Sequence, residues 1–136
     1  MKQLWIALTL LALLAGCNPS ADTKSAEEGV MSFHQSLDGG RFDQIYTNTG
    51  PEFKSVTTRE DFTRLLAAIH GKLGNFRSGK TVGWNDNVNT GGHFVTLTRE
   101  AQYDRGSAQE EFVFNIVGGK TVMIGYHINS NALITG

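Results

Sequence analysis

The spacing of apolar residues changes once along this chain, at residues 71–74, and this change limits the folds that the chain can adopt. Before it, apolar residues recur every three or four positions, as on one face of an α-helix. After it, they alternate at every second position, as in β-strands with one buried face. Helices gathered before strands are typical of an α+β domain whose helices cover one face of an antiparallel sheet. We therefore predict N-terminal helices packed on a curved, four-stranded antiparallel sheet.

Two longer helices are predicted before the change. The first starts near Asp22 and ends at residues 38–40, where glycine readily takes the left-handed conformation that closes helices. A shorter helical piece follows at 41–46. The second long helix is expected to begin at Thr57 and Glu60, which have the spacing of a capping box. The apolar stripes of the two long helices are Ala26, Val30, Phe33 and Leu37, and Phe62, Leu65, Leu66 and Ile69.

Four strands are predicted after the change, joined as a meander of hairpins. Gly79 and Gly83 interrupt the first strand, which indicates a bulge or a curved stretch. Paired glycines at 118–119 are a strong signal for a two-residue turn. The predicted strands are residues 76–84, 93–103, 109–117 and 120–129.

The first 17 residues have the pattern of an export signal. Lys2 precedes an uncharged, Leu-rich run at 4–14, which is too short to cross a bilayer. The run ends in Leu14-Ala15-Gly16-Cys17, which resembles the lipobox of bacterial lipoproteins. The resemblance implies cleavage before Cys17, diacylglycerol (palmitate-type chains) on its sulfur, and N-acylation of the new terminus. A plain secreted protein with a chance cysteine is the alternative.

The lipobox divides the chain into three parts. Residues 1–16 are expected to be the signal peptide, 17–25 the lipidated Cys17 with a tether, and 26–136 the domain. Several acyl chains anchor a protein stably where one chain does so only marginally. Asn18 follows the cysteine, where families retained at the inner membrane usually carry Asp, so the expected location is the periplasmic face of the outer membrane.

Charge and cysteine content narrow the partners further. The chain has 12 Lys and Arg against 13 Asp and Glu, and loss of Lys2 with the signal changes the net charge from −1 to −2. Binding of nucleic acid would need a basic patch, which this charge balance does not indicate, so nucleic acid is not expected as a partner. The expected partner is the membrane, through the lipid on Cys17. Cys17 is the sole cysteine, so stability must come from the core rather than from an intrachain disulfide.

Two short strings and the layout suggest a fold family. They are Phe33-x₃-Leu37-Asp38-x-Gly40-x-Phe42 near the start and Gly125-Tyr126-x-Ile128 in the last strand. Over about residues 26–134 the chain resembles small exported bacterial proteins of the cystatin-like or NTF2-like kind, in particular a domain of unknown function found in many lipoproteins. The resemblance implies a curved sheet around a long helix, often with dimerisation through the open sheet face. Such folds serve enzymes, transport adaptors and scaffolds, so function does not follow from them.

The sequence gives little support to catalysis or metal binding. His34, His70, His93 and His127 occur singly and without ligand spacing, so neither a metal site nor a cofactor is expected. No Gly-x-Ser-x-Gly elbow and no phosphate-binding loop occur in the sequence. The chain is therefore not expected to be an enzyme.

One acid–base arrangement is still conceivable, at the open end expected of this fold. Tyr103, Glu110 and His127 would converge there, and ketosteroid-isomerase-like relatives pair a carboxylate base with a tyrosine donor. However, Glu110 begins an exposed-looking strand, and His127 alternates with Tyr126, so these two neighbours face opposite sides. We predict instead a solvated acidic hairpin, a core tyrosine and a surface histidine.

The third strand suggests binding functions because both of its faces are apolar. Val113 and Val117 would lie on the face that the helices leave open, forming a site for a second copy or an envelope protein. This non-catalytic interaction module is the leading hypothesis. The alternative is a carrier of a small apolar ligand, and an isomerase-like or hydrolase-like enzyme comes third; a buried carboxylate facing a tyrosine hydroxyl would favour the enzyme. The carrier's pocket, between sheet and helix, would be lined by Trp84, Phe112, Phe114 and Tyr126.

Overall fold

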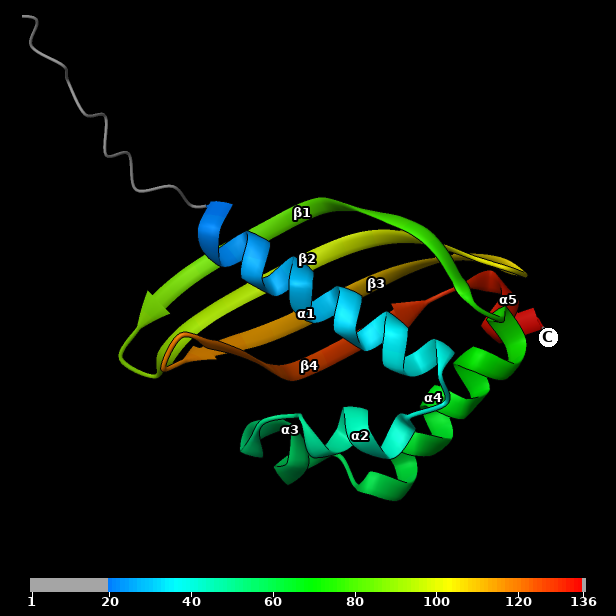
Figure 1. The fold of residues 1–136 in the computed structure, drawn as a ribbon, viewed down its shortest axis with the longest axis horizontal. Coiled ribbons are helices and arrows are strands. Elements are labelled where there is room, and N and C mark those ends of the chain that lie inside the picture. The colour runs from blue at the N-terminus through cyan, green and yellow to red at the C-terminus, as the bar shows by residue number, and fades with distance from the viewer. Residues whose placement is uncertain (1–19, 136) are drawn as a thin grey trace, which may run out of the picture.

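The computed structural model describes residues 20–135 as helices followed by a four-stranded sheet, which confirms the predicted α+β class (Figure 1). The predicted signal peptide and Cys17 lie outside the described residues. Within residues 20–135, no helix combines the length and the apolar composition needed to cross a bilayer. The elements are α1 (Ser20–Asp38), α2 (Phe42–Thr47), α3 (Pro51–Val56), α4 (Arg59–Leu73), β1 (Phe76–Asn89), β2 (Gly92–Tyr103), β3 (Gly106–Val117), β4 (Lys120–Asn129) and α5 (Asn131–Thr135).

The sheet is the predicted meander, in the order β1-β2-β3-β4, with each strand antiparallel to its neighbour. The register of β1 against β2 shifts between Thr81 and Gly83, next to one of the glycines that predicted a bulge. The same pair of strands also shifts between Phe76 and Ser78, and β3 shifts against β4 between Val113 and Phe114. Such irregularities bend strands, and the sheet curves behind α1 in Figure 1.

Helix α1 lies diagonally across one face of the sheet and contacts β1, β2 and β4 (Figure 1). Its predicted stripe is buried at all four positions, Ala26, Val30, Phe33 and Leu37. The helix begins at Ser20, two residues before the predicted start near Asp22, so residues 20–25, which the predicted domain division gave to the tether, belong to α1. The first turn is held against the sheet because Asp22 lies beside His93 of β2.

Helix α4 packs beside the sheet rather than over it, against α1, α2 and α5. Only a narrow side of α4 is therefore covered, and Leu65, predicted in its buried stripe, is exposed. The N-cap is Thr58 rather than Thr57, because the Thr58 side chain accepts a hydrogen bond from the backbone N–H of Asp61 at 3.1 Å. Thr57 is instead the C-cap of α3.

Two short helices and the end of β1 were not predicted. Helix α3 has Pro51 at its start, where a fixed φ and a missing N–H are both tolerated. Helix α5 follows β4 at the C-terminal end of the described chain. Strand β1 continues to Asn89 because residues 85–89, predicted as turn, pair with residues 92–96 of β2. The polar side chains of residues 85–89 indicated a turn, but their backbone pairs with β2 as a strand.

The loop between α2 and α3 covers the free edge of β4. Its Gly50 donates a backbone hydrogen bond to Met123 O at 2.9 Å. A Cβ at Gly50 would lie 2.9 Å from Cγ2 of Ile124, so glycine permits this close approach. Covering an edge strand is a common way to prevent unwanted strand pairing. Helix α3 contacts β4, and Ile45 of α2 lines the groove described next together with Val122 and Met123 of β4.

Candidate functional site

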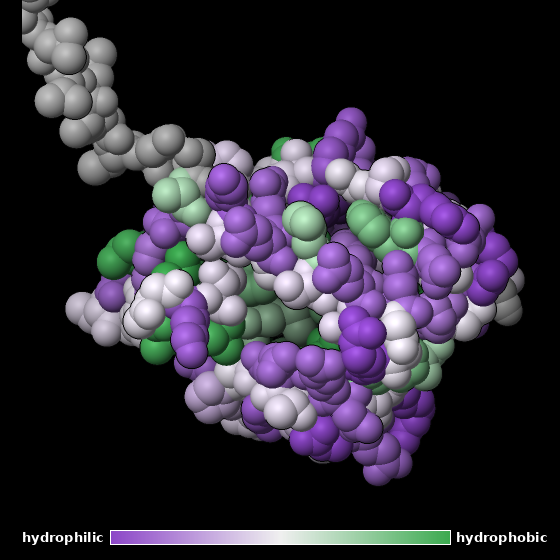
Figure 2. All heavy atoms as spheres, viewed as in Figure 1, coloured by the Kyte–Doolittle hydropathy of each residue, from purple (hydrophilic) through white to green (hydrophobic). Residues whose placement is uncertain are grey.

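An open groove of about 350 Å³ lies between α1, α2 and the β3–β4 side of the sheet. Figure 2 shows a hollow near the middle of the molecule, with apolar atoms at its floor and hydrophilic atoms around it. The apolar lining residues are Phe33, Ile45, Phe114, Val122 and Met123, and the polar ones include Ser32, Ser36, Asn48, Lys120 and Thr121. An apolar floor with a few polar groups at the rim is the usual composition of a small-molecule site.

The depth of this groove depends on Gly29 in α1. A Cβ at this position would lie 2.9 Å from Cε1 of Phe114, closer than side-chain carbons normally approach. Glycine therefore lets α1 pass directly over the Phe114 ring. Phe33, one turn further along the helix, closes the inner wall: its ring centroid lies 4.7 Å from that of Tyr126 and 5.1 Å from that of Phe112.

Of the four predicted pocket residues, only Phe114 lines the groove. Phe112 and Tyr126 are buried behind it in the core. Trp84 pairs with Leu97 on the edge strand β1 and is 54% exposed, away from the groove. The prediction considered strand aromatics alone and missed the helical contributions of Phe33 and Ile45, although Phe33 was already in the predicted buried stripe.

Behind the groove lies a buried carboxylate, Glu110 of β3, whose side chain is 0% exposed. Its Oε1 is 2.9 Å from His34 Nε2, and its Oε2 accepts hydrogen bonds from the hydroxyls of Tyr103 at 2.9 Å and Tyr126 at 2.6 Å. We call these four residues the Glu110 cluster. His34 is fixed on its other side by Phe76, whose ring stacks on it at 3.8 Å. The cluster thus joins α1, β2, β3 and β4.

The predicted solvated acidic hairpin is therefore wrong for Glu110 and right for its neighbour. Glu111 is exposed, whereas Glu110 points under α1 because it is in phase with Phe112 and Phe114. Tyr103 and Glu110 do converge, although we predicted a solvated hairpin instead of this arrangement. The predicted core tyrosine and surface histidine are confirmed: Tyr103 is buried, and His127 is exposed and pairs with Glu111 on the other face. His34 and Tyr126 complete the cluster instead.

The electrostatics of the cluster keep both tyrosines protonated. Burial, and next the negative charge of Glu110, raise the pKa of the Tyr103 and Tyr126 hydroxyls well above the ordinary value. Both hydroxyls thus remain donors to the carboxylate. Both carboxylate oxygens are already engaged and enclosed, and Phe33 and Phe112 pack between the cluster and the groove. The buried carboxylate facing tyrosine hydroxyls, the feature that would favour an isomerase-like enzyme, is therefore present, with its oxygens bonded to His34, Tyr103 and Tyr126.

The outer face of the sheet is free of helices in Figure 1, as predicted, but it is largely polar. Val113 is half-buried between Thr96 and Gly125, and Val117 is 56% exposed at the end of β3. Further along this face, a second hollow of about 450 Å³ is lined mainly by polar residues, including Glu111 and His127. The predicted apolar surface is therefore limited to the region of the two valines.

We predict that Glu110→Gln lowers the free energy of unfolding by about 2–3 kcal/mol, because it removes the charge from hydrogen bonds that are strong for that reason. Glu111→Gln is the matched control, since Glu111 is adjacent in sequence and exposed on the opposite face. It should change the unfolding free energy by less than about 0.5 kcal/mol. Urea unfolding followed by circular dichroism measures both. Equal losses in the two variants would show that the buried charge is unimportant.

We also predict that stability falls above about pH 10, the ordinary tyrosine pKa. There the unfolded chain releases protons from Tyr103 and Tyr126, whereas the native state retains them because their pKa is raised. The unfolded state then binds fewer protons, so the free energy of unfolding falls with pH, by about 1.4 kcal/mol per pH unit for each tyrosine. Below pH 10 this contribution to stability is complete.

Tyr103→Phe should remove about half of the tyrosine-dependent slope between pH 10 and 11, besides lowering stability at neutral pH. Urea unfolding at several pH values compares the variant with the wild type. Lysines titrate in the same pH range in both proteins, so the difference between the slopes of unfolding free energy against pH reports the contribution of Tyr103 alone. Identical slopes would contradict the raised pKa of Tyr103.

Neither the protein-family models nor the curated proteins compared with this chain gave a match. Two features of the described residues bear on function: the groove beneath α1 and the closed Glu110 cluster that supports the groove's inner wall.

Proposed function

We propose that this protein is a lipid-anchored binding protein of the bacterial envelope whose groove takes a small apolar ligand. The observation that carries the proposal is the groove of about 350 Å³ with Phe33, Ile45 and Phe114 in its lining. Ligand sites of small molecules have volumes of roughly 300–1,000 Å³ and are mostly apolar. Lys120 and the Ser32 hydroxyl at the rim suit a ligand with one polar or anionic end.

A rigid support behind the groove favours binding without chemistry. Phe33 contacts Tyr126, and Tyr126 donates to the buried Glu110, so the inner wall is tied to the Glu110 cluster. A wall fixed in this way loses little conformational entropy when a ligand binds. Because the Glu110 carboxylate is enclosed, a ligand in the groove would not touch it, and the proposed binding needs no reacting group.

The second candidate function is self-association, or binding of an envelope protein, through the outer sheet face. The observation in its favour is the exposure of Val117, with Val113 half-buried on the same face. We rank it below ligand binding because most of its neighbours are polar: Thr96, Thr98, Gln109, Glu111 and His127.

Ser32→Trp should abolish ligand binding, because a large side chain on the exposed groove side of α1 fills the groove. Gln35→Trp is the control, since Gln35 is exposed on α1 and does not line the groove. Native mass spectrometry of the full-length protein, released gently from detergent, should show a monomer with a reproducible extra mass in the wild type and in Gln35→Trp, but not in Ser32→Trp.

An empty dimer in the same measurement would contradict the groove proposal and favour the outer face. In that case Val113→Lys with Val117→Lys should return the protein to a monomer, since two buried charges oppose an apolar contact. A dimer mass unchanged by these substitutions would remove the outer-face hypothesis as well.

The lipid anchor is tested separately from the groove. Labelled fatty acid should be incorporated into the wild type in a bacterial host and not into Cys17→Ser, because the thioether and the cleavage both need this cysteine. Radiolabel on the purified protein is the measurement. Label retained by Cys17→Ser would refute the anchor and favour a plain secreted protein.

A further inference from the structure

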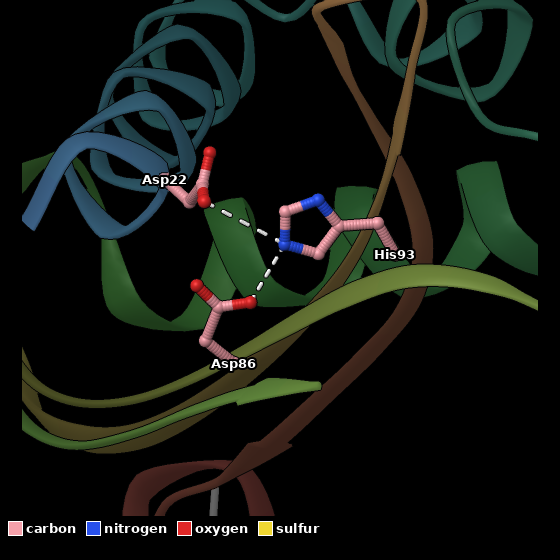
Figure 3. A group of neighbouring side chains, drawn as sticks. All are labelled: Asp22, Asp86 and His93. Atoms are coloured by element: carbon pink, nitrogen blue, oxygen red, sulfur yellow. Dashed lines mark hydrogen bonds and ion pairs between the residues drawn. The ribbon is translucent and has the colours of Figure 1, made fainter. Parts of the chain in front are cut away.

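Three side chains from separate segments converge at the start of α1. Asp22 is in the first turn of α1, Asp86 is near the end of β1, and His93 is near the start of β2. Figure 3 shows both aspartates directed at the same ring nitrogen of His93. The distances from His93 Nε2 are 2.7 Å to Asp86 Oδ1 and 3.6 Å to Asp22 Oδ2. All three ligand-type atoms lie within 4.8 Å of one another.

From this convergence we propose that Asp22, Asp86 and His93 bind a first-row divalent cation such as Zn²⁺. The spacing is close to what coordination needs: with bonds of roughly 2.0–2.1 Å, two ligands of a tetrahedral ion lie about 3.4 Å apart. The Asp22–His93 distance fits already, and the Asp86–His93 distance requires a small opening. This proposal does not depend on the groove.

The charges of the three groups suit such an ion. Two carboxylates balance a divalent charge, and a neutral imidazole supplies the nitrogen ligand that Zn²⁺ accepts readily and Mg²⁺ does not. In the part of the chain that the structure describes, the ion pairs of both aspartates are with His93, and no lysine or arginine pairs with them. The shared nitrogen thus lies between two carboxylates, where a cation would stabilise all three groups.

The local structure holds the three ligands in place while leaving room for solvent. Asp86 and His93 are two positions apart diagonally across the β1–β2 ladder, in which Val88 pairs with His93, so they share the face beneath α1. Both side chains are largely buried, whereas Asp22 is more open to water. Three protein ligands with one open side leave the fourth position of a tetrahedral ion to water.

Isothermal titration calorimetry with ZnCl₂ tests the proposal on the full-length protein, purified in detergent and freed of metal with a chelator. The wild type should bind one equivalent, and Asp86→Asn and His93→Ala should bind at least tenfold more weakly. His127→Ala is the matched control, because His127 is exposed beside a single carboxylate on the outer face, and it should bind Zn²⁺ like the wild type.

Thermal unfolding gives a second measurement of Zn²⁺ binding. It compares each variant with and without Zn²⁺, so a variant of lower stability can still be assessed. Zn²⁺ should raise the melting temperature of the wild type and of His127→Ala, because a ligand that binds only the native state stabilises it. Asp22→Asn, a conservative change in an exposed first turn, should fold normally and lose this shift. Unchanged Zn²⁺ affinity in Asp22→Asn and His93→Ala, or an equal response to Mg²⁺, would overturn the proposal.

Discussion

The hydrogen bonds of Glu110 are the interaction on which the arrangement of helix and sheet depends. An ionised carboxylate removed from water is strongly unfavourable unless its oxygens are paired. Here His34 reaches it from α1, Tyr103 from β2 and Tyr126 from β4. The two tyrosine bonds lie within the sheet, and the His34 bond joins α1 to it. Apolar burial favours many placements of α1 on the sheet, and the directional bond between His34 and Glu110 selects among them.

The groove follows from this placement. With His34 held over Glu110, the preceding residue, Phe33, faces Tyr126 and Phe112, and Gly29 passes over Phe114. The loop that follows α2 bonds to β4 through Gly50 and Met123. Neither α1 nor α2 then covers the space between them, and Phe33 and Phe114, both buried, line its floor. The hollow is a consequence of how two helices are fixed to different strands.

The period of apolar residues was enough to predict the fold class, the meander and the stripe of α1, because each depends on local spacing. The same period, applied strictly, would have placed Glu110 with Phe112 and Phe114; its charge and the adjacent Glu111 suggested exposure instead. The partners of Glu110 could not be found this way. His34 lies 76 positions earlier in the chain, and its position over β3 depends on how α1 crosses the sheet. The convergence of Asp22 with Asp86 and His93 likewise depends on tertiary packing rather than on ligand spacing.

If Cys17 carries the proposed lipid, the start of α1 is held close to the bilayer. Three chain steps separate Cys17 from Ser20, where α1 begins, and they span about 10 Å at most. The first turn of α1 contacts the β1–β2 hairpin through His93, and the β3–β4 turn lies at the same end of the sheet in Figure 1. Lys120, Thr121 and Val122 of the groove directly follow that turn. If Cys17 is lipidated, the β4 side of the groove therefore begins at the end of the sheet that lies nearest the membrane. A cation bound at Asp22, Asp86 and His93 would stiffen that end, since it would join the start of α1 to the hairpin beside it.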